Sequence, residues 1–215
     1  MDYNPNLALG LNEVNHLRKA LDQAAIVAFT DHNGIITYVN DKFCEISKFS
    51  KSELIGKTHK LINSGFHSQQ FFKEMWETIS SGKVWNGEIK NKAKDGSFYW
   101  VETTIVPFVM GDTQTSGRSD RNPYSYIAIR FDITPQKEIE ENFRQLFNAS
   151  FEGTIVCREG RILNANEAAA KIFDSTMNEL INRNPFDLFP KDTHENLIPV
   201  LNAQTEVHSE VIISK

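Results

Sequence analysis

An amide and two tryptophans lie close together in residues 81–100, "SGKVWNGEIKNKAKDGSFYW". The stretch alternates as the two strands of a hairpin do, with a turn at Asp95-Gly96. Trp85 and Trp100 supply large apolar surfaces, and the amide of Asn91 offers a hydrogen-bond donor and an acceptor together. An amide on a strand that otherwise packs needs a polar partner. This wall therefore either packs on its own core or holds a cofactor.

The surrounding pattern predicts a small sheet with short helices. "DHNG" is a hairpin turn between the first two strands, and apolar residues recur at helical spacing in the helix before the third strand. Serine and threonine residues stand where helices should begin. The expected strands are 25–30, 35–40, 84–92, 98–109 and 125–131. The expected helices are 41–47, 50–55 and about 68–80.

The same module occurs twice along the chain. "IVAFTDHNGIITYVNDKFCEI" and "TIVCREGRILNANEAAAKIF" align in one register. The matched positions are Gly34 with Gly160, Asn40 with Asn166, and Leu54 with Leu180. A shared register over this distance indicates two copies of one unit. We expect an N-terminal helical segment at 1–24, a first domain at 25–134, a connecting helix at 135–148, and an incomplete second domain at 149–215.

The connecting helix is predicted to be amphipathic. Thr134 can cap it and Pro135 suits its first position. Ile139, Phe143 and Leu146 form one apolar stripe, and the N-terminal segment has a similar one. Each stripe could pack on its own module or pair with another subunit. We therefore expect a homodimer through the N-terminal or the connecting helix.

Composition excludes several classes of protein. The 215 residues carry a net charge of −5, and the basic residues are scattered, which argues against nucleic-acid binding. No apolar stretch is long enough to cross a bilayer, so we expect no membrane contact by this segment. Cys44 and Cys157 stand in apolar runs far apart, as buried thiols of a cytoplasmic protein do. Because no catalytic triad and no metal cluster is evident, we expect no enzyme activity here.

The order of elements resembles that of a PAS domain. Two strands, several short helices and three strands end in "DIT" before a helix, and "TDHNGIITYVND", "ELIGKTH" and "DITPQK" resemble recurrent patches of that family. The resemblance implies an α+β fold, in tandem here, with a five-stranded antiparallel sheet and helices on one face. It also implies a sensory and signal-transduction role upstream of an effector, such as a histidine kinase of a two-component system or a cyclic-di-GMP enzyme.

Residues 59–108 resemble the flavin-binding PAS domains of the aerotaxis receptor and of the redox sensors that control nitrogen fixation and methane oxidation. By that match Trp85 and Asn91 fall at positions associated with flavin, and Asn63 and Trp76 fall on the pocket side. The chain departs from the aerotaxis receptor by having Asn63-Ser64 where that protein has an arginine-histidine pair. The resemblance implies a flavoprotein with FAD in the first domain.

These residue types suit an isoalloxazine ring, which needs an apolar slot and a few aimed hydrogen-bonding groups. Asn91 could meet the ring N3–H and a neighbouring carbonyl, under the helix that carries Trp76. Asn63, Ser64 or His59 could reach the outer edge, the ribityl chain or the phosphates. Reduction at N5 would change the hydrogen bonding nearby, and strand 125–131 with the "DIT" motif would pass that change to the connecting helix.

Other interpretations stay open. Trp76 and Trp85 could belong to the core, and Trp100 is interpreted as structural. His59 or His67 could ligate haem, or the first domain could bind another small molecule. The tandem could also bind nothing and act as a scaffold for dimerisation and signal relay.

Overall fold

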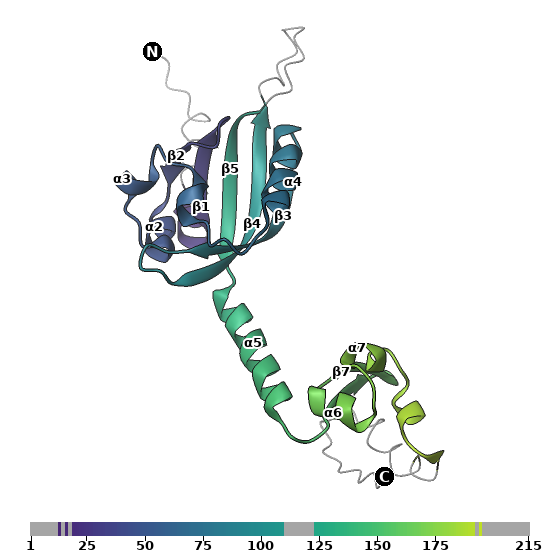
Figure 1. The fold of residues 1–215 in the computed structure, drawn as a ribbon. Helices are drawn as coiled ribbons and strands as arrows, with labels where there is room; N and C mark the ends of the chain where they lie inside the picture. Colours follow the sequence, from purple (N-terminus) through teal and green to yellow (C-terminus); the bar gives the residue numbers. More distant parts are fainter. Residues whose placement is uncertain (1–12, 14–15, 17–18, 110–122, 192–193, 195–215) are drawn as a thin grey trace, which may run out of the picture. The chain divides into compact units, whose positions relative to one another are not determined.

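The computed structural model describes residues 13, 16, 19–109, 123–191 and 194 (Figure 1). The chain divides into two compact units, and the division falls after Lys137. Residues 19–24 are helical and lead into the first strand. None of the described helices combines the length and the apolar character that crossing a membrane requires.

The first unit is built on a five-stranded antiparallel sheet with the strand order β2-β1-β5-β4-β3. The first and last strands of the unit therefore lie side by side in the middle of the sheet. The strands are β1 (Ile26–Asp31), β2 (Ile36–Val39), β3 (Trp85–Lys92), β4 (Phe98–Val109) and β5 (Pro123–Asp132). The predicted fold class is confirmed, and these strands match the expected ones closely.

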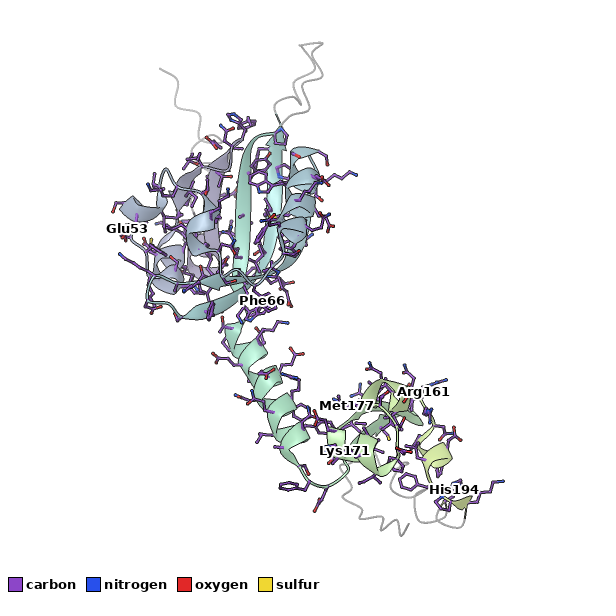
Figure 2. The ribbon with its side chains drawn as sticks, in the orientation of Figure 1. Glu53, Phe66, Arg161, Lys171, Met177 and His194 are labelled. Carbon is purple, nitrogen blue, oxygen red and sulfur yellow. The ribbon has the colours of Figure 1, made fainter. Side chains whose placement is uncertain are left out.

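Short helices cover one face of this sheet (Figure 1). They are α2 (Asp41–Ser47), α3 (Lys51–Leu54), the 3-10 helix η1 (His59–Ile62) and α4 (Gln69–Ser80). Ser68 caps α4 by accepting the Phe71 N–H, and Ser50 forms a capping box with Glu53, which Figure 2 labels. Sequence patterning did not predict η1, because one short turn has no measurable period.

One hydrophobic core fills the space between the sheet and the helices. Phe43 and Leu54 from the helices and Val101 and Ala128 from the sheet are almost fully buried within it. Burial of such side chains contributes roughly 1.5–3 kcal/mol each, which offsets the ordering of the short helices. Those helices are too short to be stable alone. Their positions therefore depend on this core.

The "DHNG" turn brings α4 close to the start of the sheet. The Asp31 carboxylate accepts the N–H groups of Asn33 and Ile35, both at 2.9 Å. Gly34 has a φ of +78°, and a Cβ added there would stand 2.7 Å from the ring of Trp76. A glycine is needed at this position both for the backbone and for the close approach of α4.

The stretch between α3 and α4, residues 56–67, lies along both edges of the sheet, and we refer to it as the crossing segment. At the β2 edge, Ile36 N–H donates to the Lys57 carbonyl at 2.8 Å. At the β3 edge, Lys90 N–H donates to Nε2 of His67 at 2.9 Å. Hydrogen bonds at both edges hold this segment against the sheet.

The second unit repeats the start of the first. It contains β6 (Ile155–Arg158), β7 (Arg161–Ala165), α6 (Glu167–Ile172), α7 (Met177–Leu180) and η2 (Pro185–Leu188). Left-handed backbone positions recur in the same register in both units. The pairs are Gly34 and Gly160, Lys48 and Asp174, and Gly56 and Asn182. The repeat predicted from the sequence is thus present in the backbone itself.

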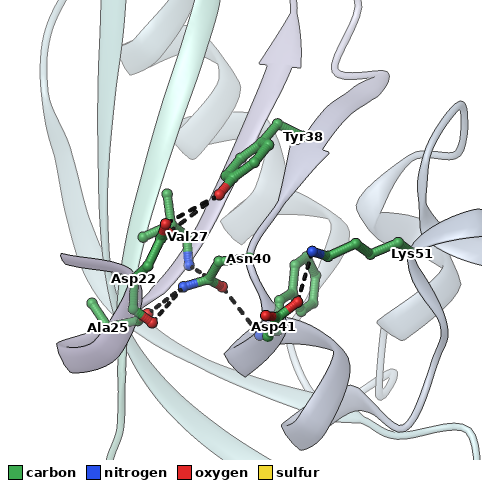
Figure 3. A network of polar contacts seen from close by, with 8 residues as sticks. Asp22, Ala25, Val27, Tyr38, Asn40, Asp41 and Lys51 are labelled. Atoms are coloured by element: carbon green, nitrogen blue, oxygen red, sulfur yellow. Dashed lines mark hydrogen bonds and ion pairs between the residues drawn. The ribbon is translucent and has the colours of Figure 1, made fainter. Parts of the chain in front are cut away.

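A buried asparagine ties the preceding helix to the first unit (Figure 3). Oδ1 of Asn40 accepts the N–H of Phe43 at 3.2 Å, which caps α2, and the N–H of Val27 at 3.0 Å. Its amide nitrogen donates to the carbonyls of Ala25 at 2.7 Å and Asp22 at 3.3 Å. One side chain thus joins helix 19–24, β1 and α2.

Asn166 does the same in the second unit. Its Oδ1 accepts the N–H groups of Ala169 at 2.8 Å and Thr154 at 2.9 Å. Its amide nitrogen donates to the carbonyls of Glu152 at 2.8 Å and Phe147 at 3.0 Å. Phe147 lies near the end of the helix that leads into β6. The same residue type therefore fastens a helix to each unit.

The predicted connecting helix is α5 (Thr134–Ala149). Its apolar stripe is largely exposed in the described part of the chain, with Ile139 at 69% and Leu146 at 76%. At its start, Lys137 pairs with Glu88 of β3 at 2.8 Å. For the similar stripe predicted near the N-terminus, Val14 and Leu17 lie outside the described residues.

Candidate functional site

The inner face of β3 carries the amide that the sequence singled out. Alternate residues of this strand point toward the core, and Asn91 is only 5% exposed. It stands opposite Tyr99 of β4, which is also buried. Its side-chain amide makes no hydrogen bond to any residue that the structure describes. Asn91 is therefore an inward-facing polar group, as a ligand-binding role would require.

Trp85 lies at the other end of β3, on the same face, and is half-buried. Its ring folds over Gly87, where an added Cβ would stand 2.6 Å from the indole. The ring also meets the edge of Phe71 of α4, with centroids 5.6 Å apart. Trp85 thus fills space between the sheet and α4.

Trp76 lies at the end of the same space, near the "DHNG" turn. Its ring meets Tyr126 of β5 edge-on at 5.7 Å, and 39% of the residue remains exposed. Trp76 therefore covers an end of the interior without belonging to the buried core.

Trp100 points the other way, as its interpretation as a structural residue requires. It is on the alternate face of β4 from Tyr99 and meets Phe66, which Figure 2 labels, edge-on at 5.1 Å. The ammonium of Lys90 lies 5.1 Å from the Phe66 ring and 5.6 Å from the Trp100 ring. This aromatic group packs outside the interior that holds Asn91.

The side chains of Asn63 and Ser64 are not brought into that interior. Asn63 is exposed and its side chain accepts the Gly65 N–H at 2.9 Å, which closes a local turn. The Ser64 hydroxyl donates to the carbonyl of Lys90 on the outer edge of β3. Local and edge hydrogen bonds use both side chains, so the ligand-binding role expected for them stays a prediction.

His59 of η1 is in the interior, where it is only partly exposed. Its ring stacks on Phe43, with centroids 5.9 Å apart and planes 9° apart. Its Nε2 lies 2.9 Å from a guanidinium nitrogen of Arg130. Burial, and secondly the Arg130 charge, hold the pKa of His59 well below its usual range. His59 is therefore neutral, with its proton on Nδ1 and Nε2 accepting.

Arg130, like Tyr99 and Thr103 of the neighbouring strand, was not singled out from the sequence. It stands on the inner face of β5, is 5% exposed, and has its guanidinium 5.5 Å from the Phe43 ring. Burial lowers the pKa of Arg130 to about 10, so it remains a cation at neutral pH. No carboxylate among the described residues lies within ion-pair distance of it. Period-two patterning would have placed Arg130 on the outer face, because the more apolar residues Ile127, Ile129 and Phe131 alternate with it.

Three buried polar atoms of this face have no hydrogen-bond partner within the described chain: Nη1 of Arg130, Oγ1 of Thr103 and the hydroxyl of Tyr99. Thr103 is directly opposite Arg130 on the neighbouring strand. Burial raises the pKa of the Tyr99 hydroxyl, which therefore stays protonated as a donor. We refer to Asn91, Tyr99, Thr103, Arg130 and His59 as the inner polar cluster. Unpaired groups at this depth are rare and are typical of binding sites.

The model of the PAS domain family matches residues 23–135 and 152–215. The chain belongs to the PAS family. It is a pair of PAS sensory domains, and the inner polar cluster lies between the sheet and the helices of the first one.

Two curated relatives are similar to part of this chain. The aerotaxis receptor of Escherichia coli (strain K12) is 34% identical over 88 residues, which are 41% of this chain and 17% of the relative. A nitrogen fixation regulatory protein of Klebsiella pneumoniae is 28% identical over 125 residues, 58% of this chain and 24% of the relative. This chain thus spans at most 24% of the length of these two relatives.

Among solved structures, a PAS domain of a protein from Colwellia psychrerythraea is 23% identical. It aligns with 57% of this chain and 98% of its own, with a TM-score of 0.47.

His59 and His67, the two histidines considered as haem ligands, each accept a hydrogen bond at Nε2 within the first PAS domain. His67 accepts the Lys90 N–H at 2.9 Å and stacks on Phe71, with ring centroids 4.2 Å apart. His59 accepts from Arg130. Within the described part of the chain, no three metal-ligating side chains come together. Haem ligation by either residue would require its hydrogen bond to break.

An open polar hollow of about 400 Å³ lies elsewhere on the first PAS domain. It lies where helix 19–24 meets β2 and α2. Asp41 and Lys51 form an ion pair at its wall, at 2.6 Å (Figure 3). Its other lining residues are Asp22, Gln23, Tyr38, Asn40, Lys42 and Glu45. Because these groups fasten helix 19–24 and α2, the hollow belongs to the anchoring of that helix.

Proposed function

We propose that the first PAS domain binds FAD between the inner face of its sheet and α4. The chain would sense redox state or oxygen through this cofactor and relay the signal to a downstream effector, such as a histidine kinase. The observation that carries the proposal is the Asn91 amide, which faces inward and is 5% exposed. An amide in this position can read the polar edge of a flat ring.

The surroundings of Asn91 support such a ligand. Trp85 and Trp76 supply aromatic surfaces beside α4, and Thr103 and Arg130 hold unpaired polar atoms on the same sheet face. Apolar walls with a few convergent polar groups are typical of cofactor sites. When bound, FAD would supply reversible electron transfer.

A ring entering this space must displace side chains. Trp85 is half-buried and Trp76 is 39% exposed, so both indoles can swing outward without leaving the surface of the domain. Gly87 would then present bare backbone to the ligand, because it carries no side chain. The position of Trp85 over Gly87 thus marks where we expect the ring to enter.

The relay would leave through β5. The Asp132 carboxylate accepts the N–H of Thr134 at 2.9 Å, and the Thr134 hydroxyl accepts the N–H of Trp100 at 2.9 Å. Ile133 N–H donates to the Trp100 carbonyl at 3.0 Å. These bonds attach the first turn of α5 to β4 and β5. A shift of these strands would therefore move the start of the helix.

The first test is the absorption spectrum of the purified chain, followed by Asn91→Ala. We expect flavin bands in the unmodified protein and lower flavin retention in the variant, since the variant cannot bond the ring. Asn86→Ala is the matched control, because Asn86 is exposed on the opposite face of the same strand. Equal retention in both variants would remove Asn91 from the site, and a colourless protein that takes up no flavin would refute the proposal.

A cofactor-free tandem that serves as a dimerisation scaffold is the second candidate. The observation favouring it is the exposed apolar stripe on α5, which includes Ile139 and Leu146. A spectrum without flavin or haem bands, combined with a stable dimer in solution, would select this candidate.

A further inference from the structure

The interior of the first PAS domain contains a cation that no carboxylate of the described residues neutralises. Arg130 is buried, its Nη1 has no partner among the described residues, and its guanidinium donates a hydrogen bond to neutral His59. A buried charge without a counter-ion destabilises a fold unless something else solvates it. The two other unpaired atoms, on Thr103 and Tyr99, are hydroxyls on the adjacent strand.

All three groups can donate hydrogen bonds on the same face of the sheet. Thr103 is directly opposite Arg130, and Tyr99 is close enough to interact electrostatically with the guanidinium. The missing partner is an oxygen-rich or anionic group. We propose that Arg130, Thr103 and Tyr99 form an oxygen-binding subsite for the flavin, a proposal that rests on the function proposed above. The oxygen is either a carbonyl of the ring or a phosphate oxygen of the tail.

His59 acts as a positioning residue in this arrangement. Its Nε2 accepts one N–H of Arg130, which holds the guanidinium over the Phe43 ring. The imidazole of His59 stacks on the same ring. A guanidinium has five N–H donors, so it can keep His59 and bind a ligand oxygen at the same time. Since His59 is neutral, it leaves the positive charge of Arg130 available to the ligand.

Stability separates this role from a structural one. If Arg130 serves the ligand, Arg130→Met should leave the melting temperature of the flavin-free protein unchanged or raise it, because a buried unpaired charge is removed. A structural arginine would give the opposite result. Thr103→Val removes the second unpaired group with almost no change in shape. The melting temperature of this flavin-free variant should likewise stay unchanged or rise.

The experiment measures flavin affinity by fluorescence titration of flavin-free protein, with melting temperatures alongside. We expect Arg130→Met to weaken FAD binding about tenfold or more, as loss of a hydrogen bond to a charged group does, and Thr103→Val to weaken it several-fold. Arg144→Met and Thr104→Val are the controls. Arg144 is an exposed residue of α5, and Thr104 bonds Asn86 on the outer face. Neither control should change the affinity.

A comparison of FAD with riboflavin, which has the same ring but no phosphates, distinguishes a ring carbonyl from a phosphate oxygen. Equal weakening of riboflavin and FAD by Arg130→Met assigns the subsite to the ring, and weakening of FAD alone assigns it to the phosphates. If the unmodified protein binds FAD and Arg130→Met binds it equally well, the subsite is refuted while the proposed function stands. If that variant does not fold, unchanged affinity in Thr103→Val refutes it. An unmodified protein that binds no flavin refutes both proposals.

Discussion

The imidazole of His59 lies between a phenyl ring and a guanidinium, and both neighbours favour its neutral form. Phe43 excludes water from one side, and Arg130 repels a second positive charge. Tyr99 and Arg130, the other titratable groups of the cluster, lose their protons only well above neutral pH. His59 is therefore the group of this cluster that could change charge in mildly acidic solution.

The stability of the first PAS domain should consequently fall in acid. Below the usual histidine pKa of 6.5, the unfolded chain takes up a proton at His59 that the folded chain does not. Each pH unit below that value costs about 1.4 kcal/mol while the folded imidazole stays neutral. The melting temperature measured from pH 8 to pH 5 should show this loss, and in His59→Gln the curve should be flatter. Parallel curves for the two proteins would contradict the assignment.

Residue-scale features were the hardest to foresee. The alternation of β3 located Asn91 on a strand without deciding which face it occupies, and the helical spacing placed Trp76 on α4. Alternation alone did not reveal that Arg130 points inward or that the Asn63 side chain closes a turn. Both depend on how the crossing segment meets the sheet, which involves contacts between residues far apart in the sequence.

At the scale of elements, the absence of a side chain at one glycine lets the "DHNG" turn and α4 lie close together. Gly34 has a φ of +78°, and a Cβ added at this residue would stand 2.7 Å from the Trp76 ring. Gly56 has almost the same backbone, with a φ of +77°, but nothing lies within 4 Å of its missing Cβ. Both positions have a left-handed backbone, but only Gly34 is in close contact with another side chain.

We therefore expect Gly34→Ala to destabilise the fold more than Gly56→Ala. Both variants force a side chain into left-handed backbone, at a cost of about 1–2 kcal/mol. Only Gly34→Ala also has to push Trp76 aside, so only it should alter the tryptophan fluorescence. The difference between their unfolding free energies in urea isolates the contact. Equal losses and unchanged fluorescence would mean that Trp76 moves freely.

The elements themselves were largely predictable from the sequence. Turn chemistry located "DHNG", period-two patterning located β3 and β4, and the repeat located Asn40 and Asn166 as equivalent residues. The 3-10 helix η1 was not foreseen, because four residues without a period give no signal. Its position depends on Ile62, which is buried in the core.

At the scale of the whole molecule, α5 joins two sensory domains and exposes an apolar stripe. Thr134 attaches its start to the first domain, and Asn166 bonds the carbonyl of Phe147 near its end. Each end of this helix is therefore bonded to the domain next to it. An apolar stripe left in water favours association with another copy.

We expect the chain to form a homodimer that depends on this stripe. Leu146→Glu introduces a charge at its most exposed position and should shift the protein toward monomer in light scattering after gel filtration. Gln145→Glu adds the same charge on the other side of the helix, next to Glu141, and should leave the mass unchanged. A dimer that persists in Leu146→Glu would locate the contact elsewhere.

The crossing segment also affects whether copies of the chain can join through the edges of their sheets. An unprotected sheet margin can recruit strands from neighbouring molecules and seed fibrils. In the first PAS domain the chain occupies part of each margin itself, with Lys57 bonded to Ile36 and His67 bonded to Lys90. Strand addition from another molecule is therefore disfavoured at these two points, where the backbone groups are already bonded.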